Sequence, residues 1–386
     1  MANFLPFALP EIGEEEIAEV VDSLRSGWVT TGPKARAFEK QFSEFLGDSS
    51  LNSISVNSAT SGLHLALEAL GVGIGDEVVI PTYTFTATAE VVRYLGATPV
   101  FVDVDSQTFN MTAESFRAAI TDKTKAVVPV HFAGLACDMD SIISIARECN
   151  IAVVEDAAHA LPTLYKGKLI GTLDSDFSVF SFYANKTMTT GEGGMVVTAN
   201  ASLAKRCQIM RLHGISRDAF DRYTSDKPAW FYEIVAPGFK YNMPDIAASI
   251  GIHQLKRLPM FHAKREDMAK FYRETLSKLP LGLPEFAKDG SSHAWHLYPV
   301  RVLNEAGVSR DEFIIRMAEE GIGCSVHFIP LHRQPYWRDT FSLSNEMFPV
   351  ADKLYLEEVS LPLYTKMTTQ DQQRVVDAIV KVLSCG

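Results

Sequence analysis

The sequence contains few cysteines, and their positions show no pattern. The chain of 386 residues has five, and none belongs to a CxxC pair: Cys137, Cys149, Cys207, Cys324 and Cys385. An odd number with this scatter fits neither a disulfide framework nor a zinc site. We therefore expect reduced thiols and no bound metal.

Long apolar runs and runs of basic residues are also missing. The longest apolar runs, such as 126–130 and 151–154, are far shorter than the roughly 18 residues that cross a bilayer. The net charge is −11, from 36 Lys and Arg against 47 Asp and Glu, and an acidic chain repels a polyanion. The N-terminus has prolines and carboxylates where a secretory signal needs a basic start and an apolar core. These absences predict a cytoplasmic protein that binds neither nucleic acid nor membranes.

What the sequence does contain is an alternation of helical and strand patterns. Residues 13–26 and 34–46 have apolar side chains at helical spacing, and a glycine follows each run. Strands are expected at 53–56, 77–80, 99–102, 125–130, 151–154, 177–182 and 194–198, and a tight hairpin at 165–171. Several are apolar on both faces, which is typical of central strands in a parallel sheet covered by helices.

The second part of the chain has a different pattern. A long helical tract at 259–279 precedes a Pro- and Gly-rich link, and then a strand, a helix, a strand and a last helix at 369–383 are expected. One hydrophobic core rarely fills a chain of this length. We therefore expect a large domain at 13–254 and a small α/β domain at 255–386, against which residues 1–12 pack.

Polar residues follow several expected strands, at the edge where parallel sheets bind ligands. A turn of small residues that includes Thr60 and Ser61 leads into a helix and can bind an anion; the alternative is a plain helix cap by Ser58. Asp156 follows another strand, and a carboxylate there can hold a protonated ring nitrogen. His159 can then hydrogen-bond a phenolic oxygen. A capping aspartate with a structural histidine is the alternative.

A lysine stands in an unusual position after a further strand. Lys186 lies between an apolar strand and a glycine-rich turn, and burial there lowers the pKa of a lysine, as Schiff-base chemistry with an aldehyde requires. Ser181 can reach a phosphate, and Phe85 can stack on a flat ring. The alternatives are a lysine that extends to solvent and an aromatic side chain in the core. Together, the anion cradle, aromatic ring, carboxylate, imidazole and lysine are the parts of a pyridoxal 5′-phosphate site.

Longer segments resemble the sugar aminotransferases of the DegT/DnrJ/EryC1/StrS family. The similarity covers nearly the whole chain and includes NSATSGLHLALEALG, VVEDAAHA, SFYANKTMTTGEGGMVVT and PGFKYNMPDIAASIGIHQL. It implies an α/β fold of the type I, aspartate aminotransferase-like class of pyridoxal-phosphate enzymes. That fold has a mostly parallel central sheet and a smaller C-terminal α/β domain.

The resemblance also implies roles for individual residues. Lys186 corresponds to the lysine that forms a Schiff base with the cofactor, Asp156 to the partner of the pyridine nitrogen, and His159 to the residue beside the ring hydroxyl. Thr60, Ser61 and Ser181 correspond to residues that bind the cofactor phosphate, and Phe85 to the aromatic residue that stacks on the ring. Thr31, His131 and His327 correspond to residues that contact the substrate. Asn242 corresponds to an asparagine that enters the neighbouring subunit's phosphate site, which implies a homodimer with shared active sites.

The activity implied is transfer of an amino group from L-glutamate to a keto sugar, with release of 2-oxoglutarate. The expected substrate is a nucleotide-linked 4-keto sugar for cell-surface polysaccharide; a 3-keto nucleotide sugar and a keto-sugar acid such as an octulosonate are alternatives. Four residues are candidates to bind a diphosphate: Arg211, His213, Arg217 and Arg222.

Other activities fit the sequence less well. Family members that remove a hydroxyl carry histidine at the position of Lys186, and a non-catalytic regulator is expected to lose Lys186 or Asp156. A metal hydrolase would need ligands from His131, His159, His327 and His332, which lack HExxH-type spacing.

Overall fold

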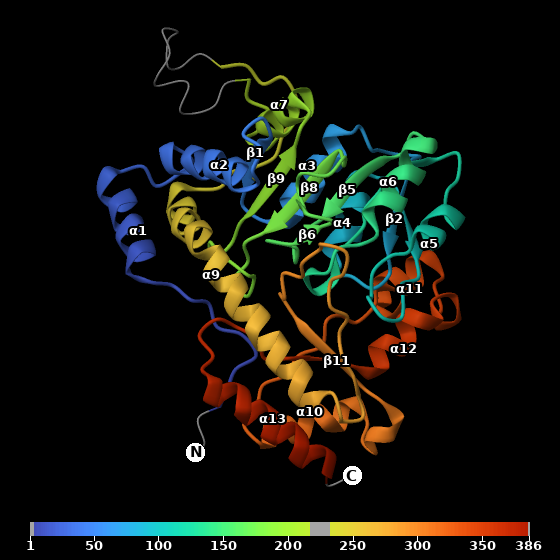
Figure 1. Cartoon of the computed structure of the whole chain (residues 1–386). Helices are drawn as coiled ribbons and strands as arrows, with labels where there is room; N and C mark the ends of the chain where they lie inside the picture. Colours follow the sequence, from blue (N-terminus) through green and yellow to red (C-terminus); the bar gives the residue numbers. More distant parts are fainter. Residues whose placement is uncertain (1–3, 217–231, 385–386) are drawn as a thin grey trace.

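The computed structural model describes residues 4–216 and 232–384 (Figure 1). The larger part is built on a seven-stranded sheet and the smaller part on a three-stranded sheet. Among the helices of these two ranges, none combines the length and the apolar character needed to span a bilayer.

The large sheet is mostly parallel, which confirms the predicted α/β class. Its strands, in spatial order, are β1 (Asn52–Val56), β9 (Gly194–Thr198), β8 (Phe177–Ser181), β5 (Ala152–Asp156), β4 (Thr124–Val127), β2 (Glu77–Pro81) and β3 (Thr98–Val102). Strand β9 pairs antiparallel with β1 and β8, and the other pairs are parallel. Strand β4 ends before the expected residue 130, close to Pro129, which has no N–H to donate. The predicted hairpin is β6 (Leu164–Tyr165) and β7 (Lys168–Leu169).

Helices cover both faces of this sheet. One face packs against α3 (Ala59–Ala69), α4 (Ala87–Tyr94) and α7 (Ala201–Met210). The other face packs against α2 (Pro33–Phe45), α5 (Ala113–Ala118), α6 (Met139–Glu148) and part of α9 (Asp245–Leu276). On β2, Val78 and Ile80 belong to one core and Val79 to the other. That alternation is typical of a strand buried on both faces.

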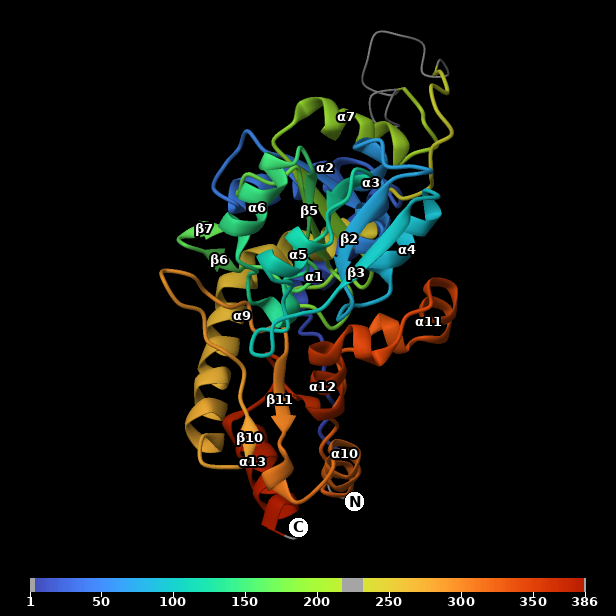
Figure 2. The same ribbon diagram turned by 90° about the vertical axis from the view of Figure 1, so that its right-hand side faces the viewer.

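The smaller part has its own core. Its strands are β10 (Leu281–Gly282), β11 (Tyr298–Val302) and β12 (Glu358–Leu361), and they pair antiparallel. Helices α10 (Arg310–Glu319) and α13 (Thr369–Ser384) pack against this sheet. Leu5 joins the same core, and its backbone pairs with Ile322, so the N-terminal segment lies against this part (Figure 2).

Helix α9 runs through both parts and differs from its prediction. It begins at Asp245 instead of residue 259, and Pro259 lies in its interior. Leu258 packs in the core of the large sheet, whereas Tyr272 packs in the core of the small one. Packing on two cores therefore outweighs the hydrogen bond lost at the proline. The domain border expected at 254–255 falls inside this continuous helix.

Two helices between α10 and β12 were not predicted. They are α11 (Pro335–Phe341) and α12 (Pro349–Glu357), and short 3₁₀ turns precede them at Leu331–Arg333 and Asn345–Met347. Trp337 and Leu354 from this segment are buried in the core of the large sheet. The chain thus returns to the larger part before it completes the small sheet.

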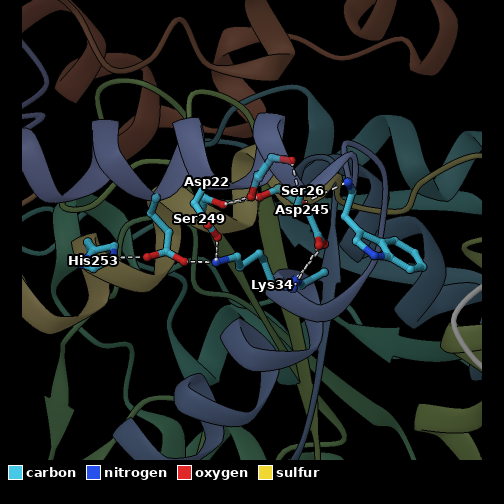
Figure 3. Close-up of polar contacts among 10 residues, drawn as sticks. Asp22, Ser26, Lys34, Asp245, Ser249 and His253 are labelled. Atoms are coloured by element: carbon cyan, nitrogen blue, oxygen red, sulfur yellow. Dashed lines mark hydrogen bonds and ion pairs between the residues drawn. The ribbon is translucent and has the colours of Figure 1, made fainter. Parts of the chain in front are cut away.

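The beginning of α2 is capped by a residue far away in the sequence. Buried Asp245 accepts the backbone N–H groups of Gly32 at 2.7 Å, Lys34 at 3.0 Å and Ala35 at 3.0 Å. The Lys34 ammonium pairs with Glu19 and, at 2.7 Å, with Asp22, both from α1 (Glu14–Ser26) (Figure 3). These contacts join α1, α2 and α9.

Candidate active site

A cavity of about 500 Å³ lies at the carboxyl ends of the parallel strands. This is the edge where open α/β sheets bind ligands. Seven predicted site residues from different segments meet in its wall: Thr60, Phe85, Asp156, His159, Ser181, Lys186 and His327.

The N-terminus of α3 forms one side of the cavity. Ser58 caps the helix by accepting the N–H of Ser61 at 3.1 Å, and Ser58, Ala59 and Thr60 line the cavity. Gly194 lets the helix begin close to the sheet, because a Cβ there would lie 2.8 Å from the Ala59 nitrogen. The first N–H groups of a helix and its dipole favour an anion such as a phosphate.

Asp156 ends β5, and two hydrogen bonds hold its carboxylate. Thr88 Oγ1 donates to Oδ2 at 2.9 Å, and the Ala158 N–H donates to Oδ1 at 3.2 Å. Burial raises the pKa of Asp156, while the hydrogen bonds and the charge of Lys186 oppose that rise. A carboxylate held in this way can keep a proton on a ring nitrogen.

The His159 ring is fixed in one tautomer. The backbone N–H of Ala133, in the turn η1 (Phe132–Gly134), donates to Nδ1 at 3.2 Å. The hydrogen of the neutral ring is therefore on Nε2. Burial and the positive charge of Lys186 lower the pKa of His159 well below its ordinary value. A neutral imidazole with an Nε2–H group can donate to a phenolic oxygen.

Lys186 lies in the turn that follows β8. Burial lowers its pKa to about 8, although the negative charge of Asp156 acts in the opposite direction. A sizeable fraction of the amine is therefore neutral close to neutral pH. The neutral amine is the form that attacks an aldehyde.

Four predicted site residues lie outside the wall of this cavity: Ser61, Thr31, Asn242 and His131. The Ser61 hydroxyl is bound to Asn57 at 2.6 Å and to Ser58 at 2.9 Å. Asn242 Nδ2 donates to Thr31 Oγ1 at 2.6 Å, and both residues line a second cavity of about 330 Å³. Within one chain, Thr31 and Asn242 therefore belong to a different cavity from Lys186.

The second cavity also contains Arg211, but its guanidinium is already occupied. Arg211 Nη1 pairs with Glu39 at 2.5 Å and donates to the Ser55 carbonyl at 2.8 Å, and the residue is buried. This position does not fit the expected contact with a diphosphate. His213 is exposed on the same segment; Arg217 and Arg222 lie outside the described residues.

His131 was expected to contact substrate, and its position conflicts with that role. Its Nε2 donates to Glu155 at 2.9 Å, its Nδ1 accepts the Cys137 N–H at 3.1 Å, and the ring has no exposed surface. His332 is equally buried and bonds to Thr82 at 2.9 Å. Neither ring lines the cavity that His159 and His327 share. In residues 4–216 and 232–384, no group of three or more His, Cys, Asp or Glu could hold a metal.

The structure adds two residues that the sequence did not single out. Thr88 reaches Asp156 from the first turn of α4. The sequence feature that could have identified Thr88 is a hydroxyl residue three positions after Phe85, in the segment that follows a strand. His296 lines the cavity with its ring centroid 4.3 Å from that of His159. No local pattern marks His296, because a long stretch of chain separates it from His159.

Each functional group of pyridoxal 5′-phosphate has a matching group in this cavity. The α3 N-terminus, with Thr60 and Ser181, is suited to bind the phosphate, and Asp156 is suited to bind the ring nitrogen. His159 is placed to bond to the ring oxygen, and Lys186 to react with the aldehyde. The residues present therefore fit this cofactor.

Comparisons with known proteins agree with this chemistry. The model of the DegT/DnrJ/EryC1/StrS aminotransferase family matches residues 10–380. The chain is 50% identical to an uncharacterized protein of Methanocaldococcus jannaschii, over 99% of this chain and 98% of that relative. It is 45% identical to the spore coat polysaccharide biosynthesis protein SpsC of Bacillus subtilis, over 98% of this chain and 96% of SpsC. The proposed sugar aminotransferase Spr1654 of Streptococcus pneumoniae is 35% identical over 99% of both chains, with TM-scores of 0.91 for its PMP-form and 0.90 for its PLP-form.

Proposed function

Because the chain belongs to the DegT/DnrJ/EryC1/StrS aminotransferase family, whose members depend on pyridoxal phosphate, we propose that it transfers an amino group from L-glutamate to a nucleotide-linked 4-keto sugar. The observation that carries this proposal is one cavity that joins the α3 N-terminus, Asp156, His159 and Lys186. The presence of both Lys186 and Asp156 argues against a dehydratase and against a non-catalytic regulator. The similarity to SpsC supports a polysaccharide precursor as the product.

The chain's own residues provide binding and proton transfer. The cofactor, when bound, supplies an electron-withdrawing ring that stabilises negative charge at the reacting carbon. Thr60, Ser181 and the α3 N-terminus bind its phosphate, Asp156 holds a proton on the ring nitrogen, and His159 donates its Nε2–H to the ring oxygen. Lys186 Nζ takes the proton from Cα of L-glutamate, and 2-oxoglutarate is released. In the second half of the cycle Lys186 delivers a proton to the sugar carbon that receives the nitrogen.

The proposal is tested by following the two half-reactions separately. We expect yellow purified protein, borohydride fixation of the chromophore to Lys186, and bleaching by L-glutamate with release of 2-oxoglutarate. A panel of nucleotide 4-keto sugars, 3-keto sugars and keto-sugar acids then identifies the acceptor. Amination of only a 3-keto sugar or an octulosonate would replace the proposed substrate. A protein that stays colourless with added pyridoxal phosphate would overturn the aminotransferase itself.

We also propose that the protein acts as a homodimer whose subunits share their active sites. In support, Thr31 and Asn242 bond to each other at a cavity separate from that of Lys186. The test mixes Lys186→Ala and Asn242→Ala subunits. If the sites are shared, a mixed dimer has one site with both substitutions and one intact site, so activity returns on mixing. Activity that stays at the level of the separate variants would contradict shared sites.

A further inference from the structure

His327 connects the active-site cavity to two polar side chains in the interior. It lines the cavity together with Lys186, and its Nδ1 lies 2.9 Å from Ser360 Oγ. Ser360 Oγ lies 2.6 Å from Glu358 Oε1. Ser360 and Glu358 are on β12 and have no exposed surface. A continuous line of hydrogen bonds therefore leads from the cavity into the core.

The backbone fixes this line of groups in place. The backbone N–H of His327 donates to the other carboxyl oxygen of Glu358, Oε2, at 2.9 Å. Ser360 exchanges two backbone hydrogen bonds with Ser325, at 3.1 and 2.8 Å. Turning any of these side chains away would leave a buried polar atom without a partner, which is costly.

The same hydrogen bonds allow two arrangements of protons. When Glu358 is ionised, Ser360 donates to Oε1 and accepts from Nδ1–H of His327, so that Nε2 is a hydrogen-bond acceptor. When Oε1 carries a proton, Glu358 donates to Ser360, Ser360 donates to Nδ1, and the hydrogen of the imidazole is on Nε2. The two arrangements differ by one proton, which enters or leaves at Nε2 while the ring stays neutral.

We infer that Glu358, Ser360 and His327 form a proton relay that acts on the keto oxygen of the sugar acceptor. The inference rests on the proposed function, in which nitrogen replaces this oxygen. The keto oxygen takes its first proton from the attacking nitrogen and becomes a hydroxyl; as the carbon–oxygen bond breaks, this hydroxyl takes the proton of Nε2 and leaves as water. Ser360 then passes its proton to Nδ1, and Glu358 passes its own to Ser360. A proton from the nitrogen newly bonded to the sugar carbon returns at Nε2 and restores the relay.

The surroundings of Glu358 suit a group that gains and loses a proton. Burial raises the pKa of Glu358 to about 8, against the hydrogen bonds from Ser360 and the His327 N–H and the charge of Arg310. The Arg310 guanidinium bonds to the backbone oxygen of Glu358 at 3.2 Å and pairs with Asp311 at 2.5 Å. The charge of Glu358 also acts on two buried groups, Tyr83 and Cys324.

The surroundings of His327 keep its ring neutral. Burial, together with the positive charge of Lys186, lowers the pKa of His327 to about 4. His159 and His296 also interact with His327, and burial lowers the pKa of both. At neutral pH the ring therefore carries one hydrogen, whose place the relay decides.

The variant Glu358→Gln tests this assignment without removing a hydrogen bond. The His327 N–H needs an oxygen acceptor, so the amide oxygen takes the position of Oε2 and the amide NH₂ faces Ser360. Ser360 must then accept from the amide and donate to Nδ1, which fixes the imidazole hydrogen on Nε2. The tautomer is read by ¹⁵N–¹H NMR of histidine-labelled protein, with the His327 signals assigned by comparison with His327→Gln.

In the wild type, we expect Nε2 to be protonated below a pH of about 8 and unprotonated above it. In Glu358→Gln, Nε2 stays protonated on both sides of that pH. The kcat for the complete reaction falls roughly 100-fold or more, and its pH profile no longer shows the ionisation of Glu358. Ser360→Ala breaks the relay, so the tautomer no longer follows pH. The neighbouring Glu357→Gln, whose carboxylate pairs with Arg301 and Lys353, leaves tautomer and kcat unchanged.

The relay and the proposed function fail in different ways. Identical His327 tautomers and kcat values in the wild type, Glu358→Gln and Ser360→Ala would overturn the relay, even in an active aminotransferase. A wild type that aminates no keto sugar would instead overturn the proposed function and with it the role of the relay in that reaction.

Discussion

Removing the hydroxyl of Thr88 tests whether the ionisation of Asp156 controls the reaction. Thr88 is 1% exposed, and its Oγ1 donates to the Asp156 carboxylate at 2.9 Å. Valine has nearly the same shape but no hydroxyl. A hydrogen bond to a charged group contributes about 1.5–3 kcal/mol. One pKa unit corresponds to about 1.4 kcal/mol, so Thr88→Val should raise the pKa of Asp156 by roughly one to two units.

The functional consequence follows from the role of the carboxylate. A less stabilised Asp156 holds the proton on the ring nitrogen less firmly, so the removal of the proton from L-glutamate slows. The same free energy in the barrier corresponds to a rate roughly 10- to 100-fold lower. Stopped-flow bleaching of the bound cofactor by L-glutamate, measured over a range of pH, reports this rate.

Thr84→Val is the matched control for this substitution. Thr84 Oγ1 lies 3.0 Å from Thr88 Oγ1 and is 2% exposed, so its replacement changes the same buried pair but keeps the bond to Asp156. We expect its half-reaction to stay close to the wild-type rate. Equal rates for Thr88→Val and Thr84→Val, with both variants folded by thermal melting, would refute the reasoning.

Two further predictions concern charge. Because the pKa of Lys186 is lowered to about 8, its modification by pyridoxal phosphate and cyanoborohydride in cofactor-free protein should accelerate as the pH rises to about 8 and then level off. Peptide mass spectrometry of the modified protein measures this rate. Exposed Lys270, whose pKa is raised by its bond to Glu266, is the control and should react more slowly. Equal modification of Lys186 and Lys270 at pH 8 would argue against the lowered pKa of Lys186. Asp245→Ala leaves two buried N–H groups at the beginning of α2 without an acceptor and should lower the free energy of unfolding by about 2–4 kcal/mol. Unfolding by denaturant measures this loss of stability. The control Asp22→Ala removes a carboxylate that is 64% exposed and should change the free energy of unfolding by less than about 1 kcal/mol. An equal effect of Asp245→Ala and Asp22→Ala would contradict the capping role of Asp245.

The site residues that could be predicted are those whose role depends on their neighbours within a short stretch of the chain. Asp156 ends β5, and Thr60 and Lys186 lie in the short segments that follow β1 and β8. The strand order of a parallel sheet brings such positions to one edge. His296 and Thr88 were not found in this way, because their roles depend on neighbours that distant segments supply. The same limit explains α9: its helical pattern was visible after residue 259, but its beginning depends on packing against two cores.

By itself, the sequence determined the alternation of strands and helices and the reactive groups at the strand ends. These follow from side-chain periodicity and from residue types next to one another in the chain. Only the tertiary structure decided what each polar side chain faces: His131 bonds inward to Glu155, Thr31 and Asn242 meet at a second cavity, and Asp245 caps a helix more than 200 residues away in the sequence. A buried polar group must find a partner wherever the fold places one, and that partner is set by three-dimensional proximity, which local patterns do not encode.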